Sequence, residues 1–310
     1  LMAKKLLEQR GEGFEKVKVF ASEFEMRGLA FELIHDIYCS YLMGGLLRRI
    51  GCKLRPYERN PGETDRVIEE ARLRLYRCIN TGESKEAVFR EIVSGFSRIA
   101  LAQSPESRPK VAIIGDLYVL DNDTFNQGLI ADLEYYGAEV VTVPFTYVVR
   151  LILDRDIRQL REDGRYLSSV GNKILAEVLE TAERRYYQVA RDILQVDFPT
   201  FDNAIFDYLN KYHVSLSHGG ETAQNILKIF SLLHDYQDIS LLIHVNPLFC
   251  CPALVSEAMF KTIEKDIGIP IVSLMYDGTN VQRNESLAPY LHYISRAQGN
   301  KGCFKENNDT

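Results

Sequence analysis

The sequence has little or none of several features that mark large protein classes. It has no tryptophan and only six cysteines in 310 residues, and no two of these form a CxxC pair. So few cysteines in so long a chain exclude a secreted disulfide scaffold, and the missing CxxC excludes zinc-ribbon and thioredoxin-type sites. No apolar run reaches the roughly 18 residues of a membrane span, and no secretory signal is recognisable. We therefore expect a cytoplasmic protein without a membrane partner.

An excess of positive charge is also missing. The formal net charge is −6, with no evident basic face, so nucleic acid is not an expected partner. With 46% hydrophobic and 26% charged residues, the chain can bury a substantial core in one large domain or two smaller ones. The sequence begins with Leu1 rather than Met, which suggests a piece cut from a longer protein.

Residues 1–107 are predicted to form a mainly helical segment. Apolar residues recur at helical spacing, and Gly51 stands where a helix-ending glycine is expected. The stretch from Ser104 to Pro109 has the composition of a linker. We expect helices over about 26–50, 64–78 and 85–102, and a short β-type run at 17–20.

Residues 108–310 alternate short apolar runs with helical patterns, which is typical of an α/β domain. A helical insertion is predicted at about 146–212. The pattern predicts a doubly wound, mostly parallel, Rossmann-like sheet, preceded by the helical segment. Strands are expected near 111–115, 140–143, 214–216, 239–245 and 271–275, with helices near 124–136, 221–233, 256–267 and 287–298.

Two adjacent cysteines, Cys250 and Cys251, follow the strongest predicted strand and precede Pro252, which suits a first helical turn. Ligands of open α/β sheets bind outside the carboxyl ends of the strands, and a helix N-terminus favours the thiolate that binds metals and clusters. Adjacent cysteines do not form the usual tetrahedral pair, so only one of them is expected to bind a single metal ion. The alternative is that one or both are small buried hydrophobes.

A second candidate site is the turn at 217–221, which precedes a predicted helix. Its glycines permit close backbone approach, and the free N–H groups of the helix can bind a phosphate, carboxyl or thioester. It lacks the Gly-Lys-Ser/Thr of a P-loop and the GxGxxG spacing. An ordinary capped turn with a structural histidine is the alternative. The predicted anion-binding residues are Ser217, His218, Gly219, Gly220 and Glu221.

Other polar residues give weaker indications. Asp116 and Asp277 follow predicted strands, where aspartate usually caps a helix or shapes a turn. The histidines lack HxxxH or HExxH spacing, and a GxSxG elbow is absent. Cys39 and Cys52 are expected to be packing residues. Catalytic residues are not assigned.

Four segments together resemble the CoA enzyme activase superfamily related to the D-component of 2-hydroxyglutaryl-CoA dehydratase. They follow one another in order between residues 54 and 279. They are LRPYERNPGETD (54–65), RPKVAIIGDLYVLDND (108–123), GAEVVTVPF (137–145) and the stretch from VNPLFCCPALVSEAM to IPIVSLMYDGT (245–279).

The resemblance implies an iron–sulfur-dependent component of a 2-hydroxyacyl-CoA dehydratase-like or ATP-driven low-potential reductase system. Such relatives have Rossmann-like domains whose cysteines hold a cluster, here expected to be 4Fe–4S, and an activase-type ATPase delivers the electron. A related pattern has a single cysteine before Met-Pro, which favours Cys250 over Cys251 as the ligand. An acyl-CoA substrate and a homo- or hetero-oligomer are also implied.

The chain departs from this pattern in two respects: one loop lacks a cysteine, and only the Cys250–Cys251 pair stands in an obvious site loop. The loop at 115–118 has no cysteine, whereas dehydratase subunits tend to supply one there. A cubane needs about three or four thiolates, so the cluster is expected to be incomplete in this chain, which resembles a C-terminal fragment. Two alternatives remain: a non-catalytic docking and electron-relay module for an activase, and a metal-free CoA-binding domain.

Overall fold

The computed structural model describes residues 31–102, 108–143, 145–199, 203–215 and 220–305. The chain divides into two compact units, 1–37 and 38–310, and the architecture below is that of the second. The predicted β-type run at 17–20 and most of the predicted linker lie outside the described residues. Among the described helices, none is long and apolar enough to cross a membrane.

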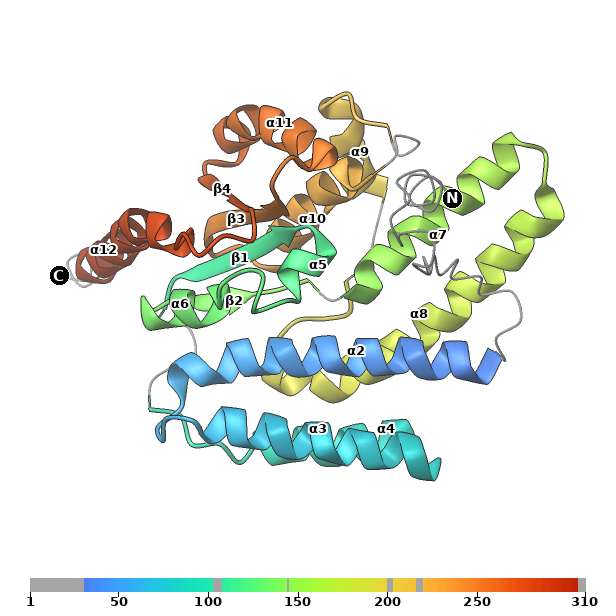
Figure 1. Ribbon diagram of the computed structural model, residues 1–310, viewed down its shortest axis with the longest axis horizontal. Helices are drawn as coiled ribbons and strands as arrows, with labels where there is room; N and C mark the ends of the chain where they lie inside the picture. The colour runs from blue at the N-terminus through green and yellow to red at the C-terminus, as the bar shows by residue number, and fades with distance from the viewer. Residues whose placement is uncertain (1–30, 103–107, 144, 200–202, 216–219, 306–310) are drawn as a thin grey trace, which may run out of the picture. The chain divides into compact units, whose positions relative to one another are not determined.

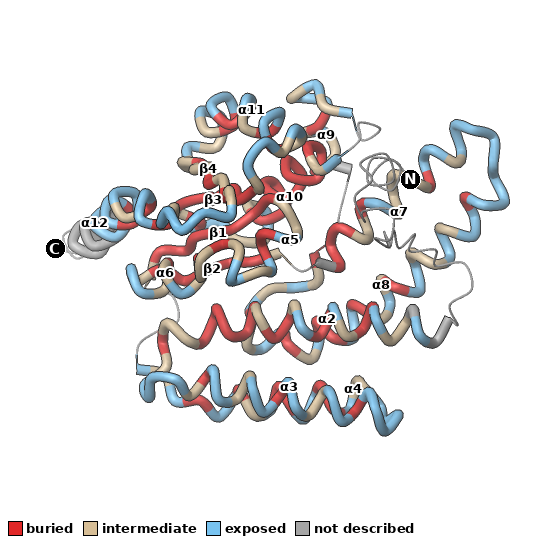
Figure 2. Tube along the Cα trace, viewed as in Figure 1, coloured by how far each residue is buried: buried red, intermediate tan, exposed pale blue. Residues whose placement is uncertain are grey.

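The described residues of the second unit form a mixed α/β structure around a four-stranded parallel sheet of order β2-β1-β3-β4 (Figure 1). Four of the five predicted strands are confirmed. They are β1 (Lys110–Gly115), β2 (Glu139–Val141), β3 (Ile239–Pro247) and β4 (Ile271–Tyr276). Their apolar runs follow from their position, because β1 and β3 are buried along almost their whole length (Figure 2).

Each face of the sheet packs against its own hydrophobic core. Ala112 and Ile114 of β1 face one core, while Val111 and Ile113 face the other, as the two-residue period of a strand requires. The first core is completed by α7 (Phe145–Glu162), α9 (Asn203–Lys211), α10 (Thr222–Asp235) and α11 (Cys251–Ile267). The second contains residues of α5 (Leu117–Leu120), α6 (Leu129–Tyr135) and α12 (Ala288–Lys305), which follows a 3-10 turn at Asn284–Leu287.

A third core joins the N-terminal helices. It contains buried residues of α2 (Phe31–Leu54), α3 (Glu63–Thr81) and α4 (Lys85–Phe96). The predicted insertion is helical, and the C-terminal part of its helix α8 (Tyr166–Leu194) contributes Tyr186, Tyr187, Ala190 and Leu194 to this same core. The insertion is therefore packed against the N-terminal helices.

Several predicted boundaries were wrong for identifiable reasons. Gly51 does not end its helix, because α2 continues to Leu54 and a Cβ on Gly51 would lie 2.8 Å from Ile68 Cδ1. The glycine instead admits a side chain of α3. The helix predicted over 124–136 is shortened to α6, which begins after Gly128 in the left-handed conformation. The strand predicted at 214–216 is wrong: Val214 and Ser215 are not in a strand, and residue 216 lies outside the described residues.

Candidate functional site

The strand order identifies one position on the sheet where the chain changes direction. From β1 the chain passes to β2 on one side, and it later returns to β3 on the other side of β1. In open α/β sheets this switch point is where ligands bind, outside the carboxyl ends of the strands. We call the residues there the switch-point site: Gly115, Asp116, Gly220, Cys250 and Cys251.

The end of β1 lies unusually close to β3. Gly115 has a φ of 127°, and a Cβ there would lie 2.1 Å from the carbonyl oxygen of Val245. The next backbone N–H, that of Asp116, donates to the same oxygen at 2.9 Å. The Asp116 carboxylate accepts from Val119 N at 3.0 Å and so caps α5. Asp116 therefore has the capping role expected from the sequence.

After β3 the chain turns sharply before α11. Cys250 N donates to Pro247 O at 3.2 Å, and Phe249 adopts a left-handed φ of 63°. Cys250 is the N-cap residue of α11 and Cys251 the first helical residue, so the helix begins five residues earlier than the predicted residue 256. Cys250 is half-buried and Cys251 is exposed, so neither is a fully buried hydrophobe.

The structure brings the two candidate loops together. Gly220 has a left-handed φ of 84°, and a Cβ there would lie 2.4 Å from Pro252 Cγ. The Thr222 hydroxyl donates to the Pro252 carbonyl oxygen at 3.0 Å. The start of α10 therefore packs directly on the start of α11, beside the cysteine pair. Of the predicted turn, Gly220 and Glu221 are described, whereas Ser217, His218 and Gly219 lie outside the described residues.

Glu221 stands at the N-terminal boundary of α10, where its side chain forms no capping hydrogen bond. Burial raises the pKa of its carboxyl group, with Asp116 acting in the same direction and Lys228 opposing it. The group therefore protonates more readily than an exposed glutamate.

A buried lysine that the sequence reasoning missed lies next to this site. Lys228 of α10 is 1% exposed, and its Nζ donates to Gly115 O at 2.8 Å and to Asn225 Oδ1 at 3.4 Å. Burial lowers the pKa of Lys228, while Glu221 and Asp116 oppose that shift. The sequence signal for Lys228 was its position as the single charged residue inside the apolar run Ile226–Phe230. Such a run is expected to be buried, so its lysine is expected to be buried with it.

A buried histidine extends the polar layer. His244 of β3 is fully buried, with Asn225 Nδ2 3.2 Å from its Nε2 and Asn246 Nδ2 2.7 Å from its Nδ1. Burial, followed by the charge of Lys228, lowers the pKa of His244 to about 3. The ring is therefore neutral near pH 7, and it links α10 to the last residues of β3 as a structural group.

The thiols of the described residues do not complete a cluster. No group of three or more His, Cys, Asp or Glu in the described part of the chain is arranged to hold a metal ion. Cys39 and Cys52 are buried, as expected, and so is Cys78. The side chain of Cys303 is outside the description. Cys250 and Cys251 therefore offer two thiolates at most, where a cubane needs about three or four.

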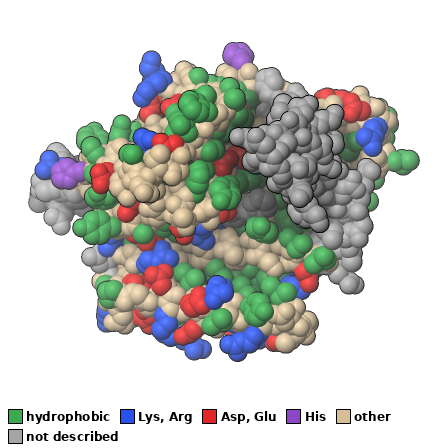
Figure 3. All heavy atoms as spheres, viewed as in Figure 1, with side chains coloured by type: hydrophobic (Ala, Val, Ile, Leu, Met, Phe, Trp, Pro, Cys, Tyr) green, Lys and Arg blue, Asp and Glu red, His purple; other side chains and the backbone are tan. Residues whose placement is uncertain are grey.

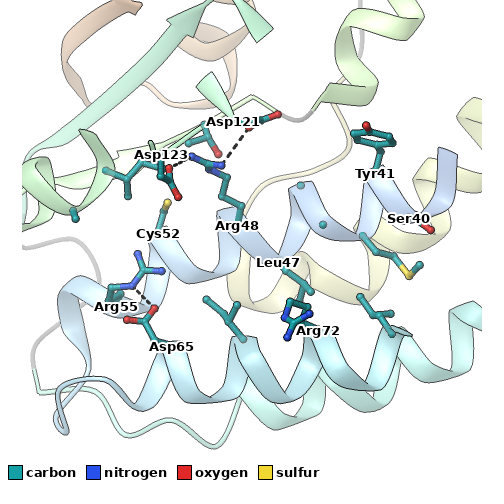
Figure 4. A pocket seen from close by; sticks show the side chains of 18 of the residues that line it. Ser40, Tyr41, Leu47, Arg48, Cys52, Arg55, Asp65, Arg72, Asp121 and Asp123 are labelled. Atoms are coloured by element: carbon teal, nitrogen blue, oxygen red, sulfur yellow. Dashed lines mark hydrogen bonds and ion pairs between the residues drawn. The ribbon is translucent and has the colours of Figure 1, made fainter. Parts of the chain in front are cut away.

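A separate cavity of about 920 Å³ lies between α2 and α3 on one side and the residues after α5 and β2 on the other (Figure 4). Arg48 points across it, with Nη2 2.9 Å from Asp123 Oδ1 and Nη1 3.5 Å from Asp121 Oδ1. Arg55 likewise pairs with Asp65 and with Glu134. Because these arginines are already paired with carboxylates, the cavity is not an evident phosphate site.

The known proteins give no independent identification: no protein-family model, no curated protein and no solved structure matches this chain. The function therefore has to be argued from the switch-point site and from the resemblance of its segments.

Proposed function

We propose that this chain is an iron–sulfur-dependent component of a 2-hydroxyacyl-CoA dehydratase-like or ATP-driven low-potential reductase system. Its sheet would be of the doubly wound, Rossmann-like type, and Cys250 would supply one thiolate to the cluster. The observation that carries the proposal is the position of Cys250. It is the N-cap of α11 at the point where the strand order reverses.

The surroundings of Cys250 favour an anionic ligand. The free N–H groups at the start of α11 carry the positive end of the helix dipole. The buried Lys228 ammonium lies below the end of β1, hydrogen-bonded to a neutral carbonyl oxygen. Both features favour negative charge at this end of the sheet.

The turn ahead of α10 is the proposed binding element for an anionic substrate such as an acyl-CoA. Its described part, Gly220, is held against Pro252, so a ligand on this turn would lie beside the cysteine pair. An activase-type ATPase is the proposed electron donor, as the resemblance implies. Because the described thiolates are too few for a cubane, the remaining ligands must come from outside this set of residues.

The test is transfer of a preformed, thiolate-ligated [4Fe–4S] cluster to the whole chain under anaerobic conditions. Bound iron, bound sulfide and visible absorption are then measured. We expect Cys250→Ala to lose most of the bound iron, while Cys78→Ala, which removes a buried thiol from the core of the N-terminal helices, retains it. Unchanged iron content in Cys250→Ala would contradict the ligand assignment.

A further inference from the structure

The cavity of about 920 Å³ beside α2, which we name the α2 cavity, contains a helix glycine that packing does not explain. Gly44 and Gly45 lie together in the middle of α2, and both line the cavity. Glycine weakens a helix, because it loses more backbone freedom on folding than any other residue. A Cβ on Gly44 would meet no heavy atom of the described residues within 4 Å, so no close neighbour requires a glycine there. The missing side chain leaves room for a ligand along α2.

The walls beside Gly44 are largely apolar. Tyr41 of α2 is 55% exposed, Tyr76 and Ile79 of α3 are 67% and 43% exposed, and all three line the cavity. In the lower part of Figure 3, where the N-terminal helices lie, hydrophobic side chains are exposed between acidic and basic ones. Covering such surface favours binding, and small-molecule sites have volumes of roughly 300–1,000 Å³. The α2 cavity therefore suits a small ligand with an apolar body.

One end of the cavity has two carboxylates for a single arginine. The Nη2 of Arg48 lies 2.9 Å from Asp123 Oδ1 and also donates to Leu120 O at 3.0 Å. Its Nη1 lies 3.5 Å from Asp121 Oδ1, and Figure 4 shows the guanidinium between the two aspartates. Among the described residues, none donates a hydrogen bond to the Asp121 carboxylate. This carboxylate is therefore a free acceptor at the edge of an apolar cavity.

The second arginine pair in the cavity has the same excess of acid. Arg55 lies 2.9 Å from Asp65 Oδ1 and 2.6 Å from Glu134 Oε1. Arg72 also lines the cavity, but it pairs with Glu69, which lies outside the lining. Two guanidinium groups therefore face four carboxylates in the lining. A cavity with this balance attracts cations and repels anions.

We infer that the α2 cavity binds an amphiphilic primary amine, with its ammonium group on Asp121 and Asp123 and its apolar body along Gly44. An ammonium group has three donors and no acceptor, which matches a carboxylate without a donor. The apolar walls favour an organic cation over a bare metal ion. The cavity shares no residue with the switch-point site, so the inference does not depend on the proposed function.

The electrostatics of Asp121 are consistent with a cationic ligand. Burial raises the pKa of its carboxyl group, and Asp123 acts in the same direction, while Arg48 and Lys228 oppose the shift. The charged form of Asp121 is therefore incompletely compensated by its surroundings. A bound ammonium group would supply both the missing positive charge and the missing hydrogen bond.

The experiment is isothermal titration calorimetry of the whole chain at pH 7 with octylamine, 1-octanol and octanoate. These probes share one apolar tail and differ in the charge of the head group. We expect octylamine to bind at least about tenfold more tightly than octanol, and octanoate to bind most weakly. Octylamine that does not bind, or that binds no more tightly than octanol or octanoate, overturns the inference.

Two variants test the two parts of the site separately. Gly44→Leu fills the space along α2 and should weaken the binding of octylamine and octanol alike, by at least about tenfold. Gly171→Leu is its matched control, because Gly171 also lies within a helix, has no described heavy atom within 4 Å of an added Cβ and does not line the cavity. It should bind both probes as the wild type does.

Asp121→Asn should remove most of the preference for octylamine over octanol while leaving the affinity for octanol unchanged. Asp156→Asn, which alters an aspartate of α7 outside the lining, is the control and should keep the preference. Circular dichroism and thermal unfolding verify that every variant folds. A folded Gly44→Leu that binds octylamine like the wild type, or a folded Asp121→Asn that keeps the full preference, contradicts the assigned site.

Discussion

Two buried lysines lie at opposite ends of the sheet and have different partners. Lys53 of α2 reaches the start of β2, where its Nζ lies 3.0 Å from Glu139 Oε1, and Tyr57 donates to the same carboxylate at 2.7 Å. Lys228 of α10 reaches the end of β1, where its Nζ donates to a carbonyl oxygen of Gly115 at 2.8 Å. One charge is neutralised by a carboxylate, whereas the other is held by neutral oxygens.

This difference separates the end of the sheet that is held by ion pairs from the end where we propose the functional site. At the amino end, the ion pair joins the N-terminal helices to β2, and Lys110 of β1 pairs with Asp238 in the same region. At the carboxyl end, the hydrogen bonds of Lys228 leave a positive charge near the place where ligands of such sheets bind. A chain selected for stability alone would gain little from that arrangement.

The largest expected effect is at the amino end. Lys53→Met leaves Glu139 buried without its cation, and we expect a loss of about 3–5 kcal/mol in the free energy of unfolding. Urea denaturation measures it. Arg66→Met, which breaks an exposed pair with Glu70, is the control and should cost less than about 1 kcal/mol. If Lys53→Met lost as little stability as the control, the Lys53–Glu139 pair would not be what holds the amino end of the sheet.

The carboxyl end depends on close backbone packing, which glycine substitutions can measure. Gly220→Ala combines left-handed strain with a collision against Pro252, whereas Gly62→Ala has a similar φ of 85° and nothing within 4 Å. We expect about 1 kcal/mol of destabilisation at Gly62 and an additional ~1–3 kcal/mol at Gly220. If thermal unfolding showed the same loss of stability for both variants, the start of α10 could move away from α11 at little cost.

Acid should destabilise the carboxyl end through His244. Its pKa of about 3 in the folded chain lies below the roughly 6.5 of an unfolded histidine, so the unfolded state binds more protons between these values. Unfolding free energy should therefore fall as the pH drops through this window, by about 2 kcal/mol at pH 5. His244→Gln should lack this component. The exposed control His292→Gln should keep the wild-type pH dependence of stability. If His244→Gln kept that same dependence, His244 would not be the group that causes the acid destabilisation.

The sheet could be predicted because its strands are short apolar runs separated by turn residues. The same reasoning located Cys250 and Cys251 at the end of β3, since Pro252 marks the start of a helix. It failed at Val214 and Ser215, which belong to an apolar run too short to fix its own conformation and are not in a strand. The continuation of α2 past Gly51 depended on packing against α3, which local sequence does not record. The start of α6 depended on the left-handed conformation of Gly128.

The candidate site was only partly predictable for a similar reason. The contact between Gly220 and Pro252 joins residues that are far apart in the sequence, and no local pattern specifies it. Lys228 looked like an ordinary helix residue, because its role depends on where the end of β1 lies. A single polar residue in an apolar helical run is the one signal that pointed to it.

The smallest expected effect is the most direct test of the contrast between the two lysines. Lys228→Met removes a buried ammonium whose burial opposes its charge, but it also leaves the Gly115 carbonyl oxygen without that donor. These opposing changes should leave the free energy of unfolding at pH 7 within about 1 kcal/mol of the wild type.

Because the pKa of Lys228 is lowered on folding, the unfolded state binds more protons between that pKa and about 10.4. The wild type should therefore gain stability relative to Lys228→Met as the pH rises through this window. The exposed control Lys265→Met should show the same pH dependence of stability as the wild type. A large loss at pH 7, like that expected for Lys53→Met, would show that Lys228 is also a structural charge and would remove the distinction between the two ends.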